Sequence, residues 1–242
     1  MTYDAVIFDL FGTLVDNFSF HDYQCSLSAM AAALGVPSQD FHHLWRETAR
    51  ARGTGLFATI EANIEHICHR LGLHVGADRV VAATRIRLDL TRQTLTPRRD
   101  ALEMLGSLKA HGYRIGLTSD CSPEVPLLWP ATALAPLVDV PIFSCKVGVK
   151  KPDPRIYRLA CERLTVSPQH CLYIGDGSSR ELTGASQVGM HPVLIRVPYE
   201  EAIHSSLRPD AEEEWQGVRI SALREVLTLV ARRLGDGASH TL

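Results

Sequence analysis

Four short segments of this chain carry side chains that hydrolytic chemistry uses. Residues 9–13, Asp-Leu-Phe-Gly-Thr, follow one apolar run, and Ser119 closes a second. Lys151 stands before a proline, and residues 176–181 begin and end with an acid. Carboxylates are the ligands that a hard divalent cation prefers, and a lysine and a hydroxyl both bind anionic oxygens. Each residue taken alone could cap a helix or satisfy a turn, but capping does not explain the four segments together.

An alternation of strands and helices would position these segments. Short β-branched runs are found at Ala5–Phe8, Tyr113–Leu117, Val138–Phe143, Cys171–Ile174 and Pro192–Val197. Helical patterns between the later runs cover Arg99–Ala110, Arg155–Leu164 and Arg180–Val188. This alternation favours a parallel sheet with helices on both faces. Since chemistry in such sheets gathers at the carboxyl ends of the strands, we expect the four segments to meet at one edge.

Residues 17–96 have a purely helical pattern. The stretches expected to be helical are Phe18–Leu34, Ser38–Ala51, Leu56–Leu71 and Ala77–Gln93. Gly35 and Gly72 are typical helix ends, and Ser38 is expected to be an N-cap. We therefore predict an α/β protein with a Rossmann-like parallel-sheet core, residues 1–16 and 97–242, and an inserted α-helical cap domain, residues 17–96. A further strand is expected near Trp215–Ile220, followed by a helix over Ala222–Leu234.

In this order, the four segments resemble the motifs of the haloacid dehalogenase superfamily, which contains many phosphatases. The first motif, an aspartate followed by x-D-x-T, corresponds to residues 9–13 except at one position. The second is Ser119, the third is Lys151 before Pro152, and the fourth is a Gly-Asp pair with an acid five residues after the aspartate. The resemblance covers residues 4–197, and a helical insertion after the first motif is similar to the subgroup with a helical cap.

The resemblance implies a Mg²⁺-dependent phosphatase that acts on a small phosphate ester through an aspartyl-phosphate. The implied catalytic residues are Asp9, Lys151 and Ser119. The implied metal ligands are Asp9, the backbone oxygen of Phe11, Asp176 and Glu181. The implied substrate-binding residues are Phe11, Gly12, Thr13, Asp120 and Arg52. Of these, Arg52 is chosen because it lies in a basic, glycine-rich turn, for which a helix end with solvated arginines is an equal alternative.

Phe11 departs from the family pattern. Family phosphatases have a second aspartate at this position, and it protonates the leaving oxygen and later activates water. A phenyl ring does neither, and such acid–base help is worth roughly 10²–10⁴-fold. Three readings stay open: a phosphatase for good leaving groups or with a borrowed acid, a 2-haloacid dehalogenase, and a non-catalytic binding protein. Halide leaves without a proton, which favours the second reading, whereas Asp176 favours the first.

Composition excludes several other classes of function. The 242 residues are 45% hydrophobic and 21% charged with a formal net charge of −2, so no general attraction to nucleic acid or anionic lipid is expected. No stretch reaches the ~20 apolar residues of a membrane span. The six cysteines form no Cys-x-x-Cys pair, which favours a reducing compartment. We expect a cytoplasmic protein with a small-molecule substrate.

Overall fold

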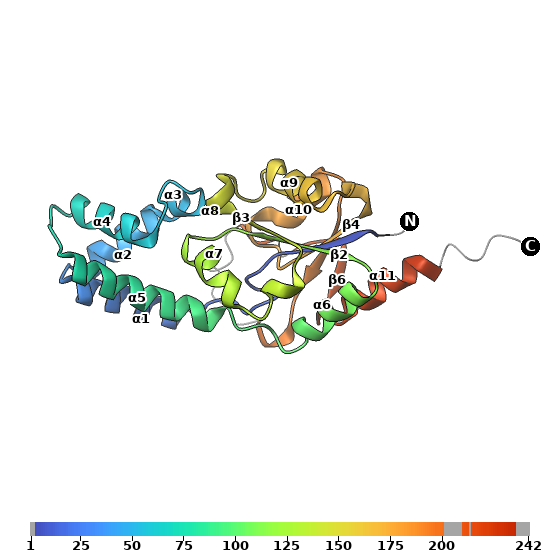
Figure 1. Ribbon diagram of the computed structural model, residues 1–242, viewed down its shortest axis with the longest axis horizontal. Helices are drawn as coiled ribbons and strands as arrows, with labels where there is room; N and C mark the ends of the chain where they lie inside the picture. The colour runs from blue at the N-terminus through green and yellow to red at the C-terminus, as the bar shows by residue number, and fades with distance from the viewer. Residues whose placement is uncertain (1–2, 201–209, 213, 236–242) are drawn as a thin grey trace, which may run out of the picture.

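The computed structural model describes residues 3–200, 210–212 and 214–235. Its centre is a six-stranded parallel sheet in the order β3-β2-β1-β4-β5-β6. The strands are β1 (Ala5–Phe8), β2 (Arg114–Ser119), β3 (Val140–Phe143), β4 (Cys171–Gly175), β5 (His191–Ile195) and β6 (Val218–Ile220). The first strand, β1, lies at the centre of the sheet, between β2 and β4, and both of these neighbours come much later in the chain (Figure 1). The predicted fold class is confirmed.

Alternating side chains of the strands face the helices that cover the two sides of the sheet. Val6 and Phe8 pack with α6 (Ala101–Ala110) and α11 (Glu225–Gly235) in one hydrophobic cluster. Ala5 and Ile7 pack with α9 (Pro154–Leu164) and α10 (Glu181–Gln187) in another. Successive side chains of a strand point to opposite faces, so a four-residue apolar strand supplies both cores. The short helices α7 (Glu124–Leu128) and α8 (Ser144–Val147) follow β2 and β3.

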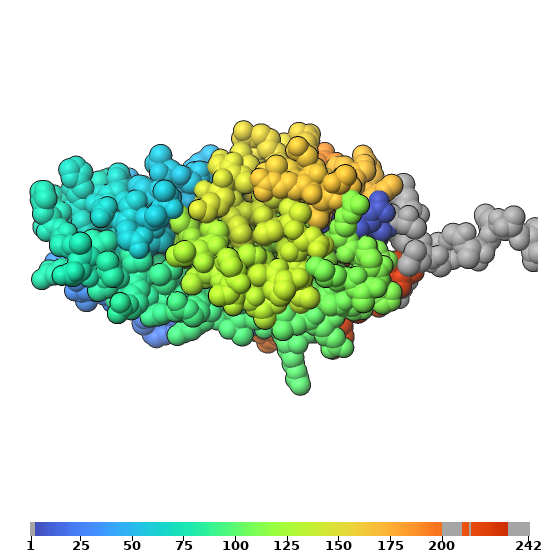
Figure 2. Space-filling view, viewed as in Figure 1, coloured from blue at the N-terminus to red at the C-terminus, as the bar shows by residue number. Residues whose placement is uncertain are grey.

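Five helices between β1 and α6 build a separate core, here called the helical layer. They are α1 (Phe20–Leu34), α2 (Ser38–Glu47), α3 (Ala49–Gly53), α4 (Ile60–Arg70) and α5 (Ala77–Thr94). Met30, Trp45 and Ile64 are among the fully buried side chains at its centre. The helical layer forms one end of an elongated molecule, blue to teal in Figure 2, and α1 and α5 run side by side along it (Figure 1).

Several predicted boundaries are wrong by a few residues, and one expected helix is divided. The N-cap of α2 is Pro37, not Ser38, and α4, expected from Leu56, begins at Ile60. The stretch from Ser38 to Ala51 is interrupted at Thr48, whose hydroxyl donates to the carbonyls of residues 44 and 45 at 2.9 and 3.1 Å. Thr48 has φ −81° and ψ 0°, outside the helical range, and this change of backbone direction separates α2 from α3.

Candidate active site at the carboxyl edge of the sheet

Asp9 and Asp176 follow the adjacent strands β1 and β4, so their carboxylates meet at the carboxyl edge of the sheet. After Asp9 the chain turns at once, and the amide of Gly12 donates to the carbonyl of Val15 at 2.8 Å. Gly12 has a φ of +76°, and a Cβ there would overlap the carboxylate of Asp176. Only glycine meets both demands without strain. Gly12 therefore allows the two loops to approach each other.

Lys151 is the centre of the buried charges. Its ammonium group donates to Oδ1 of Asp9 and, at 2.6 Å, to Oε2 of Glu181. Its backbone amide donates to Oδ1 of Asp120 at 2.9 Å, so side chains from three separate segments of the chain fix the residue. The Lys151–Pro152 peptide is cis. One cation thus orients the carboxylates that follow β1 and begin α10.

Glu181 is fully buried, and both of its carboxylate oxygens accept hydrogen bonds. Oε2 accepts from Lys151 and from the Tyr173 hydroxyl at 2.8 Å, and Oε1 accepts from the Gly177 amide at 2.9 Å. Tyr157 in turn donates to the backbone carbonyl of Glu181 at 3.0 Å. This shell fixes Glu181 and, through it, the position of the lysine ammonium group.

Burial shifts the pKa values of these groups. Burial raises the pKa of Asp9 to about 6; the ammonium of Lys151 opposes the rise, and the charge of Asp176 adds to it. Burial, Asp9 and Asp176 likewise hold the pKa of Glu181 well above its usual value. Burial by itself lowers the pKa of Lys151, but Asp9 and Glu181 outweigh it and the pKa lies well above 10.5. Lys151 therefore stays charged in the neutral pH range.

Three buried carboxylates converge closely enough to hold a metal ion. Ligand atoms of Asp9, Asp176 and Glu181 all lie within 4.8 Å of one another. Asp176 is oriented by the Ser178 amide at 2.9 Å and by the Asn17 side-chain amide at 3.3 Å. Hard cations such as Mg²⁺ take carboxylate and carbonyl oxygens, so this donor set fits that ion.

Phe11 is half-buried, and its ring is held by another aromatic side chain. It stacks on the Phe18 ring with the centroids 5.0 Å apart and the planes at 28°. The guanidinium of Arg87, on α5, lies 5.4 Å from the Phe18 centroid. Phe11 thus connects the loop after β1 to α5 of the helical layer through the Phe18 ring.

The remaining predicted residues of the sheet edge have different surroundings. The Thr13 hydroxyl donates to Oδ2 of Asp9 at 3.3 Å and is fully buried. Asp120, apart from holding the Lys151 amide, lies 3.6 Å from the ammonium of Lys150. Ser119 ends β2 with a fully buried hydroxyl that has no hydrogen-bond partner of good geometry among the described residues. A buried hydroxyl with free bonding capacity suits an incoming ligand oxygen.

Arg52 does not join this group. It is 3% exposed, and its guanidinium donates to the Trp45 carbonyl, to Thr48 and to Asn63 at 2.7–2.9 Å. Its carbon Cζ also lies 4.0 Å from the Trp45 ring centroid. The expected substrate contact does not fit this placement, because these contacts bind the side chain into the helical layer.

The neighbouring Arg50 lies closer to the loops of the sheet edge. It lines a polar pocket of about 330 Å³ together with Lys150, Lys151 and Ser179. Ser179 and the next residue, Arg180, both have positive φ values, 56° and 51°. Strained backbone of this kind is concentrated at functional sites. The pocket therefore places Arg50 close to Lys150 and Lys151.

Sequence reasoning missed the residues that support the charged cluster. Tyr173 is a polar residue in the otherwise apolar fourth strand, and its hydroxyl bonds to both Glu181 and Thr118. Arg196, one residue after β5, donates to the backbone carbonyl of Asp176. A hydroxyl inside a buried strand needs a partner, and this signal could have identified Tyr173.

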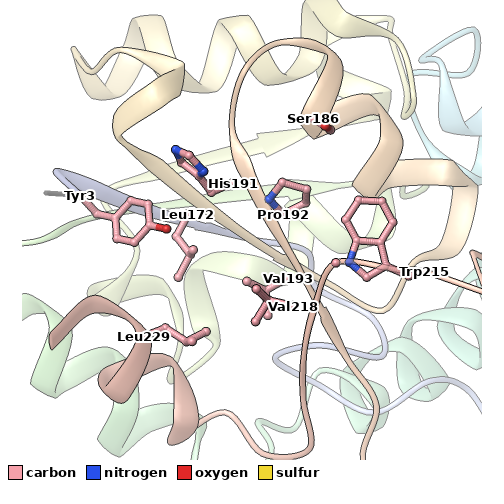
Figure 3. Close-up of a pocket in the computed structure, with 10 residues that line it drawn as sticks. Tyr3, Leu172, Ser186, His191, Pro192, Val193, Trp215, Val218 and Leu229 are labelled. Carbon is pink, nitrogen blue, oxygen red and sulfur yellow. The ribbon is translucent and has the colours of Figure 1, made fainter. Parts of the chain in front are cut away.

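A second pocket lies at the opposite edge of the sheet. Figure 3 shows it between the beginnings of β4, β5 and β6, with Leu172, His191 and Val218 on its wall. Its volume is about 360 Å³ and its lining is mainly apolar. Because parallel α/β sheets place their chemistry at the carboxyl ends of the strands, this pocket is not the candidate active site.

Comparisons with known proteins agree with this geometry. The model of the haloacid dehalogenase-like hydrolases matches residues 3–189. The (S)-2-haloacid dehalogenase 4A of Burkholderia cepacia is 27% identical over 79% of this chain and 82% of its own length. The glyceraldehyde 3-phosphate phosphatase of Methanopyrus kandleri is 27% identical over 67% and 70%.

Among solved structures, the 2-haloacid dehalogenase of Pseudomonas syringae is similar in fold. Its TM-score is 0.70 at 22% identity, over 96% of this chain and 100% of that chain. The similar proteins thus include enzymes named for phosphate and for haloacid chemistry.

None of the helices in the described ranges is long and apolar enough to cross a membrane.

Proposed function

The chain belongs to the haloacid dehalogenase-like hydrolases, and on this basis we propose that it is a Mg²⁺-dependent phosphatase for a small phosphate ester. The observation that carries the proposal is the buried convergence of Asp9, Asp176 and Glu181 around Lys151. A dehalogenase that uses no metal has no need for Asp176 beside the nucleophile. That carboxylate raises the pKa of Asp9 and so opposes its ionisation.

In this proposal Asp9 is the nucleophile. One carboxylate oxygen attacks phosphorus, the bond from phosphorus to the ester oxygen breaks, and the leaving oxygen carries away the electron pair. Water then cleaves the acyl-phosphate and restores Asp9, so that one difficult step becomes two easier ones. Lys151 keeps Asp9 ionised and binds a phosphoryl oxygen, and the Ser119 hydroxyl donates to another.

The metal ligands in the proposal are Asp9, Asp176 and the backbone oxygen of Phe11. Bound Mg²⁺ would neutralise the repulsion between the carboxylates and the phosphate dianion. Glu181 would reach the ion through water, since Lys151, Tyr173 and an amide already occupy its oxygens. Gly12, Thr13 and Asp120 complete the substrate cradle, and residues 17–96 act as a cap over it.

Phe11 limits the range of substrates. The leaving alkoxide needs a proton, and the stacked phenyl ring has none to give. The proposal therefore predicts a preference for esters whose leaving group is already a weak base, such as aryl or acyl phosphates.

A second candidate function is 2-haloacid dehalogenation, and Phe11 is the observation that favours it. A halide departs as an anion without protonation, so an aromatic residue at this position costs nothing. The similarity to the Burkholderia cepacia dehalogenase supports this alternative. The third reading, a non-catalytic binding protein, predicts a bound ligand without turnover.

A substrate panel separates the three readings. Phosphate release from aryl, acyl and alkyl phosphates is measured with Mg²⁺ and with a chelator, and chloride release from 2-chloropropionate is measured in parallel. Mg²⁺-dependent phosphate release supports the phosphatase, and metal-independent chloride release supports the dehalogenase. Absence of both from a folded protein overturns both enzymatic readings. The Asp9→Asn variant is the background control in every assay.

A further inference from the structure

Asn17 lies in the linker that leads from the loop after β1 to α1, the first helix of the helical layer. Its half-buried side-chain amide donates to Oδ2 of Asp176 at 3.3 Å, across 159 positions of the chain. A Cβ on Gly12 would overlap both the amide nitrogen of Asn17 and the carboxylate of Asp176, so the two groups lie together over that glycine. A side chain at the edge of the helical layer therefore touches a ligand of the proposed metal site.

The neighbouring residue, Asp16, anchors this linker. Oδ1 of Asp16 accepts from Nε of Arg98 and from the Tyr199 hydroxyl, both at 2.9 Å. The backbone amide of Arg98 also donates to the carbonyl of Leu14 at 2.9 Å. These contacts join the segment that enters the helical layer to the segment that leaves it, so the side chain of Asn17 extends from an anchored backbone.

The hydrogen bond from Asn17 restricts the rotation of the Asp176 carboxylate without blocking it. The Ser178 amide donates to Oδ1 at 2.9 Å, so each oxygen has a donor and the plane of the carboxylate is set. A carboxylate oxygen offers about two lone-pair sites, so one hydrogen bond leaves it able to bind a cation. Partners of this kind, behind the ligands themselves, contribute roughly 10–100-fold to metal affinity.

The effect of such a partner depends on the ion. Mg²⁺ requires near-ideal octahedral geometry at about 2.0–2.1 Å, whereas Ca²⁺ accepts flexible geometry at longer distances. A side chain that holds one carboxylate in one orientation therefore matters more for Mg²⁺ than for Ca²⁺. A side chain that contributed only packing or only charge would affect both ions to a similar degree.

We propose that Asn17 is a positioning residue of the metal site, which holds Asp176 in the orientation that Mg²⁺ requires and so favours Mg²⁺ over Ca²⁺. The inference rests on the proposed function, because it takes Asp176 as a metal ligand. It goes further by assigning part of the choice of ion to a residue that does not bind the metal. Asn17 acts through Asp176 alone.

The test measures ion binding in the absence of substrate. Calorimetric titrations of the full chain give the dissociation constants of Mg²⁺ and Ca²⁺. Asn17→Leu keeps the approximate volume of the side chain and removes its donor. We expect this variant to bind Mg²⁺ about ten-fold more weakly, and Ca²⁺ less than about three-fold more weakly. Wild-type affinity for Mg²⁺, or equal losses for the two ions, overturns the proposal.

Ser19→Ala is the matched control in the same linker. The Ser19 hydroxyl caps α1 by accepting from the Asp22 amide at 3.3 Å, so the variant weakens the start of this helix without removing a contact to Asp176. Its affinities for both ions should equal those of the wild type, and a Mg²⁺ loss as large as that of Asn17→Leu would overturn the role of the amide. Urea unfolding checks each variant, and Asn17→Ala repeats the measurement without an added apolar side chain.

Asp176→Ala separates this inference from the proposed function, because it should weaken the binding of both ions. Mg²⁺ binding that depends on Asp176 but not on Asn17 overturns the inference alone. A wild type that binds no Mg²⁺ overturns the proposed phosphatase together with the inference.

Discussion

Buried charges occur in two regions of this molecule, and their arrangements differ. At the sheet edge, three carboxylates meet one lysine, and burial and mutual repulsion raise the pKa values of Asp9 and Glu181. Between the helical layer and α7, Arg87 of α5 forms one ion pair with Glu124 of α7 and lies 5.2–5.7 Å from three aromatic rings. Like charges brought together are unfavourable for folding, while paired opposite charges against rings are not. The first arrangement indicates function, and the second indicates structure.

The largest expected effect concerns the charged cluster at the sheet edge. Asp9→Asn should reduce hydrolysis by about a thousand-fold or more, because a neutral amide is a poor nucleophile. The fold should be retained, since the amide is nearly isosteric. Steady-state kinetics and circular dichroism measure the two results, with the exposed Asp89→Asn as control. Turnover above a few per cent of wild type would exclude Asp9 as the nucleophile.

The metal site is the next test. Asp176→Ala should lose Mg²⁺ binding, because a hard cation depends on charged oxygen ligands and few converge here. Calorimetric titration of wild type and variant measures the affinity, and Asp89→Ala, at an exposed acid of α5, is the control. Equal Mg²⁺ affinity in Asp176→Ala would remove the metal site and favour the dehalogenase.

Breaking the Arg87–Glu124 ion pair should change the stability of the fold rather than the rate of hydrolysis. Arg87→Met leaves the buried Glu124 carboxylate unpaired, which should lower the free energy of unfolding by about 3–5 kcal/mol. The double variant Arg87→Met/Glu124→Leu should recover most of this loss, since no isolated charge remains. Urea unfolding measures both. If Arg87→Met instead lowered kcat with unchanged stability, the structural assignment of this pair would fail.

Phe11 lies at the boundary of the two regions, and its replacement should give a smaller effect, an increase in the rate of hydrolysis. Phe11→Asp places a carboxyl beside the leaving oxygen, so alkyl phosphate hydrolysis should rise by roughly ten-fold or more. Aryl esters should gain less, because their leaving groups need little protonation. Phe18→Leu is the control for simple loss of the ring stack. A folded, Mg²⁺-binding Phe11→Asp protein without any gain on alkyl esters would favour the ligand-binding reading.

The smallest effect is a pH dependence of stability. The pKa of Asp9 is raised from 3.8 to about 6 in the folded protein. Its contribution therefore favours folding most below pH 3.8 and is lost as the pH rises through about 6. Between about pH 5 and 7, metal-free wild type should lose about 1 kcal/mol of unfolding free energy relative to Asp9→Asn. Urea unfolding in a chelator measures this difference, and a constant or opposite difference would contradict the pKa of Asp9.

Much of the fold could be predicted because its signals are local. The five main strands were located within a few residues, since short β-branched runs stand out from helical patterns. The order of the motifs identified the family before any contact was known. Helix boundaries were less predictable: the break at Thr48 is a change in one backbone angle, and the local sequence gives no signal for it.

The sequence predicts which residues lie at the sheet edge, because the motifs are in the segments after parallel strands, and parallel strands end together. How their charges are used depends on the tertiary contacts. It directed Arg52 into the helical layer, enclosed Glu181 with three donors, and stacked Phe11 on Phe18. These outcomes depend on side chains competing for the same partners in a closely packed interior. A local sequence pattern does not show which of these partners a buried side chain binds.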